Sequence, residues 1–458
     1  MKKITGKISY LWIFAIGLLL RLIGIFRLDL GEWDERYHAL VAKNLMIHPL
    51  KPALITDGLL PLNALDWSMC DVWLAKPPLA MWLMAVSMKI FGINEIGLRL
   101  PSIIISLGSL YLTCKIGKKL FNKTIALWAV FFYGVNGLLY EINTGIIAGD
   151  HVDTLFFFLF QLSIFIILKD TPNQTRRTSI QIGILTGLAF LTKWTMACFI
   201  PLVIIPIFWL QSKRFRDMIV FVALMVIFAT CTAAPWLVYI VYHFPYEAKN
   251  ILFTMVTPVT EVIQEHGGGW YYYLNTMRIN IHEGIYLPLL FLIFFLWKKP
   301  SQKLWILAIW IGLPLVLLSI FATKREVYLM MLATPFFLTM GYFLDVLYHL
   351  MLMEGRKILA WALPILFVLI SLRYTVERVK PWVPRGVKPT YRSEIERVLS
   401  SAKVPADSII LVNEPHYIEA RFYYGVIGYR YVSDQDIDLW TSKGYKVFSW
   451  SDGNYLSK

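Results

Sequence analysis

The chain has 458 residues, of which 57% are hydrophobic and 16% are charged, and its formal net charge is +14. This balance excludes an ordinary soluble globular protein, because most of the chain must be solvated by lipid. A nucleic-acid-binding protein is not expected either, since the Lys and Arg residues sit in short clusters between apolar runs, a pattern typical of membrane-protein loops.

The first apolar run, at 8–27, follows a basic N-terminal stretch. The run is long and is not followed by a small-residue cleavage site before Asp34, so it predicts an uncleaved membrane helix rather than a signal peptide. Membrane spans are expected wherever a run approaches the roughly twenty residues that cross about 30 Å of hydrocarbon. Such runs lie at 8–27, 99–117, 124–141, 152–168, 179–192, 195–211, 218–242, 284–297, 304–322, 327–348 and 358–374. The sequence therefore predicts an α-helical integral membrane protein with about eleven spans.

The apolar segment 77–91 would reach only about 22 Å as a helix and is expected to lie flat on the outer surface. This choice places nearly every basic loop on the cytoplasmic side, as the positive-inside rule requires. The result is a multi-pass protein of the inner (plasma) membrane with its N-terminus in the cytoplasm and its C-terminus outside. The polar segments 28–98, 142–151 and 243–283 then share the extracytoplasmic face.

A carboxylate pair, Asp34 and Glu35, opens the first outer segment within the sequence WDERYH at 33–38. Helical spacing follows at 39–46. One interpretation is a helix cap in which Glu35 complements the helix dipole. The other is a catalytic carboxylate that accepts a proton from an acceptor hydroxyl. Position alone leaves both open.

Several cations fall on the same predicted face. Lys76 precedes two prolines at the start of the flat segment, where it would contact lipid headgroups or bind a lipid phosphate. Lys193 lies in a tight turn between two spans. The pair Lys324–Arg325, with Tyr328 nearby, suits a phosphate or pyrophosphate, the alternative being a local salt bridge with Glu326.

Two further outer segments carry candidate residues. Asp153 stands at the head of a helix in GDHVDT (149–154), as a cap or as a functional acid. The segment 261–273 contains Glu265 and His266 followed by three glycines and aromatic residues, which predicts either a flap over a site or a plain flexible loop. Glu265 and His266 could bind acceptor or metal, and the two acids and the histidine at 149–154 hint only weakly at a metal, because they offer just three candidate ligands. The four cysteines show no metal spacing.

The tail loses the long apolar runs. Helical spacing at 392–403 and short strand patterns at 408–412, 429–432 and 445–450 predict a small α/β domain outside the membrane.

The order of these motifs resembles the dolichyl-phosphate-mannose-protein mannosyltransferase superfamily, and within it the bacterial members of the aminoarabinose lipid A transferase type. The similarity covers roughly residues 8–345, and the Asp-Glu pair followed by Lys-Pro-Pro is its specific part. It implies a GT-C fold, with a transmembrane catalytic domain at 1–374, in which 28–98 is the first outer loop with its juxtamembrane helices. The extracytoplasmic domain would be 375–458.

The resemblance further implies a glycosyltransferase that moves a sugar from a polyprenyl-phosphate donor to a lipid, glycan or protein acceptor, with inversion. No cofactor is expected, and a divalent metal is allowed but not indicated. The carboxylates expected to be catalytic are Asp34, Glu35 and Asp153. The residues expected to bind the donor phosphate are Lys76, Arg99, Lys193, Lys324, Arg325 and Tyr328. Those expected to contact the acceptor or form a flap are Tyr37, Glu265 and His266.

Two other functions are consistent with parts of the pattern. A glycan ligase or polymerase with a diphosphate-linked donor would use the same fold. A polyprenyl-lipid flippase or transporter would need polar residues through the membrane centre, and few mid-span charges other than Arg21 are present, which disfavours it.

Overall fold

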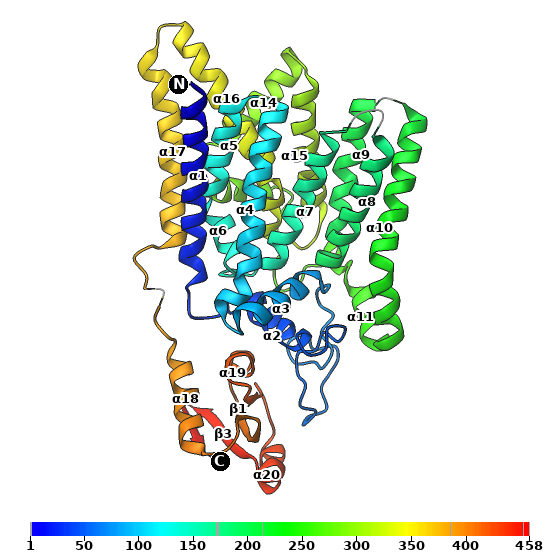
Figure 1. Ribbon diagram of the computed structural model, residues 1–458, viewed down its shortest axis with the longest axis vertical. Helices are drawn as coiled ribbons and strands as arrows, with labels where there is room; N and C mark the ends of the chain where they lie inside the picture. The colour runs from blue at the N-terminus through cyan, green and yellow to red at the C-terminus, as the bar shows by residue number, and fades with distance from the viewer. Residues whose placement is uncertain (1, 171–173, 213, 385, 452, 458) are drawn as a thin grey trace. The chain divides into compact units, whose positions relative to one another are not determined.

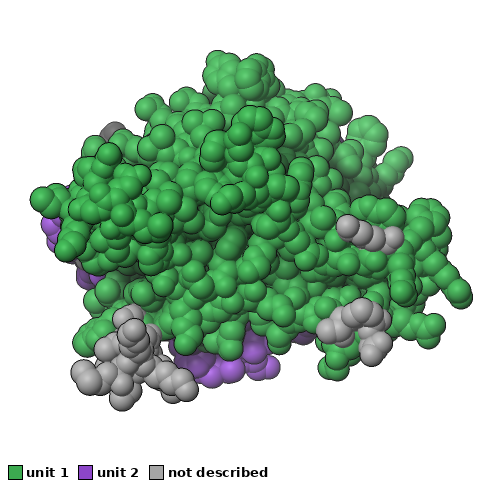
Figure 2. All heavy atoms as spheres, turned by 90° about the horizontal axis from the view of Figure 1, so that it is seen from above, with its two compact units in different colours: residues 1–22, 102–144, 151–381 green, residues 23–101, 145–150, 382–458 purple. Residues whose placement is uncertain are grey.

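The computed structural model describes residues 2–170, 174–212, 214–384, 386–451 and 453–457. The chain forms two compact units, coloured separately in Figure 2. Unit 1 comprises residues 1–22, 102–144 and 151–381; unit 2 comprises 23–101, 145–150 and 382–458. The predicted domain boundary after residue 374 stays a prediction.

Unit 1 is built from helices, the longer of which run side by side (Figure 1). Its elements are most of α1 (Lys2–Ile25) and of α4 (Glu95–Leu120), then α5 (Lys123–Val135), α6 (Gly137–Asn143), α7 (His151–Ile167), α8 (Thr175–Lys193), η1 (Trp194–Cys198), α9 (Phe199–Ser212), α10 (Phe215–His243), α11 (Pro245–Thr254), α12 (Thr257–Thr260), α13 (Tyr272–Asn280), α14 (Tyr286–Lys298), α15 (Gln302–Ile320), η2 (Glu326–Leu332), α16 (Ala333–Met353) and α17 (Lys357–Val379).

Six helical stretches among the described residues are long and apolar enough to cross a membrane, or seven if the bent pair α5–α6 is one span. They are α4, the stretch Thr175–Ser212, α10, α15, the stretch Glu326–Met353 and α17. Shorter apolar helices occur at Tyr10–Ile25, Leu79–Phe91, His151–Ile167 and Tyr286–Lys298. A multi-pass membrane protein is therefore confirmed, whereas six or seven candidates are fewer than the eleven expected.

The stretch Thr175–Ser212 is interrupted where a turn was predicted. Helix α8 ends at Lys193, and Trp194 has a backbone φ of 36°, a conformation that ends a right-handed helix. The short 3-10 helix η1 then leads into α9. The predicted break at Lys193 is confirmed.

Unit 2 combines two helices of the 28–98 segment with the C-terminal α/β domain. Its elements are α2 (Asp34–Leu45), α3 (Leu79–Phe91), the start of α4, α18 (Thr390–Ala402), η3 (Ala406–Ser408), β1 (Ile409–Val412), α19 (Tyr417–Tyr424), β2 (Ile427–Gly428), α20 (Asp434–Ser442), β3 (Lys446–Ser451) and β4 (Asn454–Ser457). The sheet has the order β2-β1-β3-β4, in which β1 runs parallel to β2 and β3, and β4 is antiparallel to β3.

The C-terminal domain has its own apolar core. Helix α18 buries Tyr391, Ile395, Val398 and Ala402, a stripe at helical spacing that packs against β1. The helix and the strands predicted at 392–403, 408–412 and 445–450 are confirmed. The strand predicted at 429–432 is wrong: pairing with β1 is already made by β2, and beyond Tyr429, whose amide donates to the Leu411 carbonyl at 2.8 Å, the chain turns away.

Candidate active site

The two neighbouring acids at the start of α2 lie in different environments. Asp34 is the first residue of the helix and Glu35 the second, so neither is the N-cap, which is Trp33. Successive helical residues point about 100° apart. The Asp34 side chain is 24% exposed, whereas that of Glu35 is fully buried.

Glu35 is held by two arginines and a backbone amide. Arg99 donates from Nε to Oε1 at 2.7 Å and from Nη2 to Oε2 at 3.0 Å. Arg27 donates to Oε2 at 3.1 Å, and the Gly31 N–H donates to the same oxygen at 2.5 Å. Such charge-assisted, bidentate contacts fix a carboxylate in one orientation. Arg27 was missed by sequence reasoning, although it lies only eight residues before its partner.

Glycines make room for this carboxylate. A Cβ added at Gly145 would lie 2.4 Å from the Glu35 carboxyl carbon, and Gly145 has a φ of +67° that a side chain would strain. A Cβ on Gly31 would lie 2.0 Å from the Gly145 carbonyl oxygen. The two segments can therefore approach each other only because both residues lack a side chain.

Asp34 is presented beside a cation. The Lys76 ammonium lies 3.8 Å from Asp34 Oδ2, and the two side chains are 26% and 24% exposed. A long, partly exposed ion pair is weak. Each of the two side chains can therefore leave its partner and bind a substrate group instead. The structure thus brings together the predicted acid and the predicted phosphate-binding lysine.

Arg99 and Tyr37 were predicted to contact substrate, and both are buried. Arg99 is 0% exposed and also donates to the backbone carbonyls of Arg27, at 2.7 Å, and Asp29. Tyr37 is 2% exposed, with its hydroxyl 3.4 Å from that of Tyr417. These positions favour holding the fold over the predicted contacts with phosphate and acceptor.

Unit 1 contains a second charged cluster. Asp153 lies in the first turn of α7 and forms a buried ion pair with Lys193, at the end of α8. The Lys193 ammonium also lies 4.9 Å from the centre of the Tyr328 ring, a cation–π geometry. Three predicted site residues therefore meet here, and Asp153 pairs with a cation instead of capping its helix.

The predicted flap is tied to the turn that carries Lys324 and Arg325. The Lys324 amide donates to the His266 carbonyl at 2.7 Å, and Arg325 Nη2 donates to the Gln264 side chain at 2.8 Å. Gln264 and Glu265 have positive φ values of 50° and 62°, so the segment is bent sharply at this point. Burial and the nearby charge of Arg325 lower the pKa of His266, which keeps its imidazole neutral near pH 7.

Of the two cations in that turn, Lys324 is buried and Arg325 is partly exposed. Lys324 is 4% exposed and donates to the Phe321 carbonyl at 2.5 Å. Glu326, the expected salt-bridge partner in this turn, accepts instead from the Asn280 amide at 3.0 Å. Within the described ranges no group of three or more His, Cys, Asp and Glu side chains converges on a point suitable for a metal ion.

The predicted residues thus form two groups. Unit 2 holds Asp34, Glu35, Lys76 and Arg99; unit 1 holds Asp153 with Lys193 and Tyr328, and the 264–266 segment with Lys324 and Arg325. Unit 2 also contains a buried pair that was not predicted, in which His38 Nδ1 lies 2.5 Å from Asp150 Oδ2. His38 and Asp150 are 112 residues apart, so no local pattern could signal their contact.

Comparison with solved structures identifies the fold. The chain shares its fold with ArnT from Cupriavidus metallidurans in the apo state, at 16% identity and a TM-score of 0.70, with 98% of this chain and 94% of that chain covered. The same protein bound to undecaprenyl phosphate gives a TM-score of 0.67 at 13% identity, covering 95% and 88%. The Archaeoglobus fulgidus oligosaccharyltransferase gives 0.58 at 10% identity, covering 96% and 69%. The fold is that of GT-C-like membrane proteins.

Sequence comparison then shows which proteins part of the chain resembles. Residues 75–239 match the family described as dolichyl-phosphate-mannose-protein mannosyltransferase. The undecaprenyl phosphate-alpha-4-amino-4-deoxy-L-arabinose arabinosyl transferase 1 of Pseudomonas fluorescens is 25% identical over 280 residues, which are 58% of this chain and 47% of the relative. The undecaprenyl phosphate-alpha-4-amino-4-deoxy-L-arabinose arabinosyl transferase of Yersinia pestis (strain Pestoides F) is 25% identical over 276 residues, which are 58% of this chain and 49% of the relative. The matched region spans about half the length of these relatives. Residues 75–239 are thus similar to this mannosyltransferase family, and the predicted resemblance is confirmed.

Proposed function

We propose that this protein is a membrane glycosyltransferase that moves a sugar from a polyprenyl-phosphate donor to a lipid, glycan or protein acceptor. The observation that carries the proposal is the pairing of a partly exposed carboxylate, Asp34, with a partly exposed lysine, Lys76, at 3.8 Å. The names of the curated relatives, which specify undecaprenyl phosphate and arabinosyl transfer, support the donor class.

The chemistry follows from the charges of the two groups. As the bond from sugar to phosphate breaks, the departing lipid phosphate gains negative charge, which an adjacent ammonium such as Lys76 stabilises. A hydroxyl acceptor attacks the opposite face of the sugar and gives its proton to Asp34, so the configuration at the anomeric carbon inverts. If the acceptor is a phosphate, no base is needed, and Asp34 orients it or stabilises positive charge on the sugar.

Glu35 would support this chemistry without contacting substrate. Its carboxylate is turned into the protein and bound by Arg99 and Arg27. A fixed Glu35 anchors the first turn of α2, on which Asp34 is the neighbouring residue. We assign Glu35 and Arg99 to positioning and Asp34 to proton transfer or orientation.

The charged groups of unit 1 are further candidates for lipid-phosphate and acceptor binding. Arg325 and Tyr328 are partly exposed, and Lys193 lies beside Tyr328. Asp153 would hold the Lys193 ammonium through their ion pair. His266, whose imidazole is neutral, would act as a hydrogen-bonding group. The reaction is proposed to need no metal or other cofactor.

We also propose that the protein lies in the inner membrane with about eleven spans. That number is reached when the bent pair α5–α6 counts as one span and the short apolar helices of α1, α7 and α14 count as one span each. The stretch Thr175–Ser212 then counts as two spans, α8 and α9. The N-terminus would then lie in the cytoplasm and the C-terminus outside. Reporter fusions at the C-terminus and after Ser212 test this assignment.

The test of the function is turnover by the full chain in vesicles of bacterial envelope lipids, with undecaprenyl-phosphate-linked 4-amino-4-deoxy-L-arabinose as donor probe. Asp34→Asn should lower kcat by about 10²–10⁴-fold. Lys76→Met should raise the donor KM. The matched controls are Asp71→Asn and Lys51→Met, which break an exposed ion pair of 3.1 Å in the same loop and should leave turnover unchanged.

A fully active Asp34→Asn protein would overturn the proposal. A diphosphate-linked donor, assayed in parallel, separates this function from that of a glycan ligase. The anomeric configuration of the product, read by NMR, tests inversion.

A further inference from the structure

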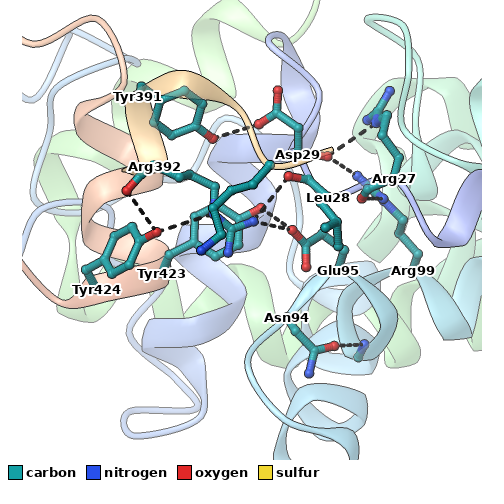
Figure 3. Close-up of polar contacts among 12 residues, drawn as sticks. Arg27, Leu28, Asp29, Asn94, Glu95, Arg99, Tyr391, Arg392, Tyr423 and Tyr424 are labelled. Atoms are coloured by element: carbon teal, nitrogen blue, oxygen red, sulfur yellow. Dashed lines mark hydrogen bonds and ion pairs between the residues drawn. The ribbon is translucent and has the colours of Figure 1, made fainter. Parts of the chain in front are cut away.

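Helix α18 of the C-terminal domain contacts residues 28 and 29, just before Asp34, through polar side chains (Figure 3). The Tyr391 hydroxyl donates to Asp29 Oδ1 at 2.7 Å. Arg392 Nη1 donates to the Leu28 carbonyl at 3.1 Å. Both contacts lie within unit 2 and join residues more than 360 positions apart.

A buried carboxylate reinforces this contact. Glu95, the first residue of α4, is 5% exposed and accepts from Arg392 at 2.9 Å and from the Tyr423 hydroxyl at 2.8 Å (Figure 3). The Arg392 guanidinium also lies 3.9 Å from the centre of the Tyr423 ring. A charge with so little access to water is stable only with such partners, so the C-terminal domain and the start of α4 depend on each other.

The 27–29 segment links this network to the acid pair. Its carbonyls at Arg27 and Asp29 accept from Arg99, the same guanidinium that binds Glu35. Displacing the segment would move the acceptors that orient Arg99. The contacts therefore run without interruption from α18, through 27–29 and Arg99, to the first turn of α2.

A second contact holds the rest of α2. Helix α19 packs on α2, and Lys43 donates to the carbonyls of Arg421 and Phe422 at 2.6 and 2.9 Å. These carbonyls belong to the last turn of α19, where that of Arg421 also accepts from the Gly425 amide at 3.3 Å. Arg36, near the start of α2, lies 3.6 Å from Glu419 of α19. Both ends of α2 are thus fixed by the C-terminal domain.

We propose that Tyr391 and Arg392 are positioning residues for the Asp34–Glu35 segment, so that the C-terminal domain sets the geometry of Asp34 without touching substrate. The catalytic consequence rests on the proposed function. The positional claim does not, because it concerns how firmly residues 27–37 are held.

The experiment is hydrogen–deuterium exchange on the full chain in detergent, followed over residues 27–37. Arg392→Ala should accelerate exchange there by about tenfold or more, since a part-buried ion pair with Glu95 and the hydrogen bond to Leu28 are lost. Tyr391→Phe removes one hydroxyl and should give a smaller acceleration in the same peptide. Arg392→Lys should restore part of the protection. The matched control is Arg397→Ala, on the same helix but in an exposed i,i+3 pair with Glu394.

Activity gives the second readout. In the turnover assay, Arg392→Ala and Tyr391→Phe should lower kcat and leave the donor KM unchanged, whereas Arg397→Ala should change neither. Exchange at 27–37 equal to that of the control would overturn the proposal, as would accelerated exchange with an unchanged kcat. If Arg392→Ala does not fold, Tyr391→Phe decides. If the wild-type chain transfers no sugar from any donor, the proposed function fails, and exchange alone still decides whether α18 holds the segment.

Discussion

The substitution Glu35→Gln tests whether the two adjacent acids have different tasks. Glu35 is fully buried and accepts from Arg99, Arg27 and the Gly31 amide. Glutamine has nearly the same size, but it removes the charge and directs an NH2 group at donors. Arg99, itself 0% exposed, then remains as a buried cation without its carboxylate.

The magnitude follows from that burial. Breaking a buried ion pair by removing one partner costs about 3–5 kcal/mol, a large part of the roughly 5–15 kcal/mol that stabilises a typical protein. Asp34→Asn breaks only a partly exposed pair and should cost less than about 1 kcal/mol. Glu35→Gln should therefore destabilise the fold, while Asp34→Asn should lower kcat by about 10²–10⁴-fold and leave the protein stable.

The assay is maleimide labelling of Cys70, a thiol of unit 2 that is 2% exposed, in a chain whose other cysteines are serine. A loss of about 3–5 kcal/mol should raise the labelling rate about a hundredfold or more where reclosing is faster than labelling, because the rate then follows the opening equilibrium. The control is Glu32→Gln, an exposed acid of the same segment. Labelling at the wild-type rate in Glu35→Gln would refute the argument that Glu35 is structural.

Three further predictions concern stability in detergent. Gly145→Ala should cost more than about 2 kcal/mol through strain and a clash with a buried carboxyl, whereas Gly312→Ala, with open space at its Cβ, should stay within about 1 kcal/mol; equal melting curves would contradict this. Burial raises the pKa of Glu419 to about 7 against the lowering effect of a neighbouring arginine, so the folded state binds the extra proton. The free energy of unfolding should accordingly fall by up to about 3 kcal/mol as pH rises from about 4.5 through 7, and Glu419→Gln should flatten that slope. Asp153→Asn should cost about 3–5 kcal/mol by leaving Lys193 buried and unpaired, and adding Lys193→Met should recover part of it; a double variant no more stable than the single one would count against the pair.

The features predictable from the sequence are those with a local signal. Apolar runs predicted the long helices, the break at Lys193 was expected from a charged residue between two runs, and the apolar spacing of α18 predicted a helix. The environment of each acid was not predictable. Asp34 and Glu35 are chemically similar neighbours in the sequence, and which of them faces inward follows from tertiary partners such as Arg99, 64 residues away.

The same limit applies to the roles given to cations. Arg99 was assigned to phosphate by its place in a family pattern, yet burial and two backbone carbonyls occupy its guanidinium. Charge and motif order do not report solvent exposure. The two-residue β2 was missed for another reason, since so short a strand carries no periodic signal and exists only through its pairing with β1.

The contacts between α18 and residues 28–29 also set an order in time. Their partners are separated by 362 and 364 positions, so the ribosome makes the segment before Asp34 long before the residues that hold it. While the intervening helices are synthesised and inserted, that segment lacks its contacts with Tyr391 and Arg392. Loop closure over such a distance is late and slow, so the last step of folding would be the one that locks the acid pair. A chain stopped after α17 would insert its helices and still lack that lock.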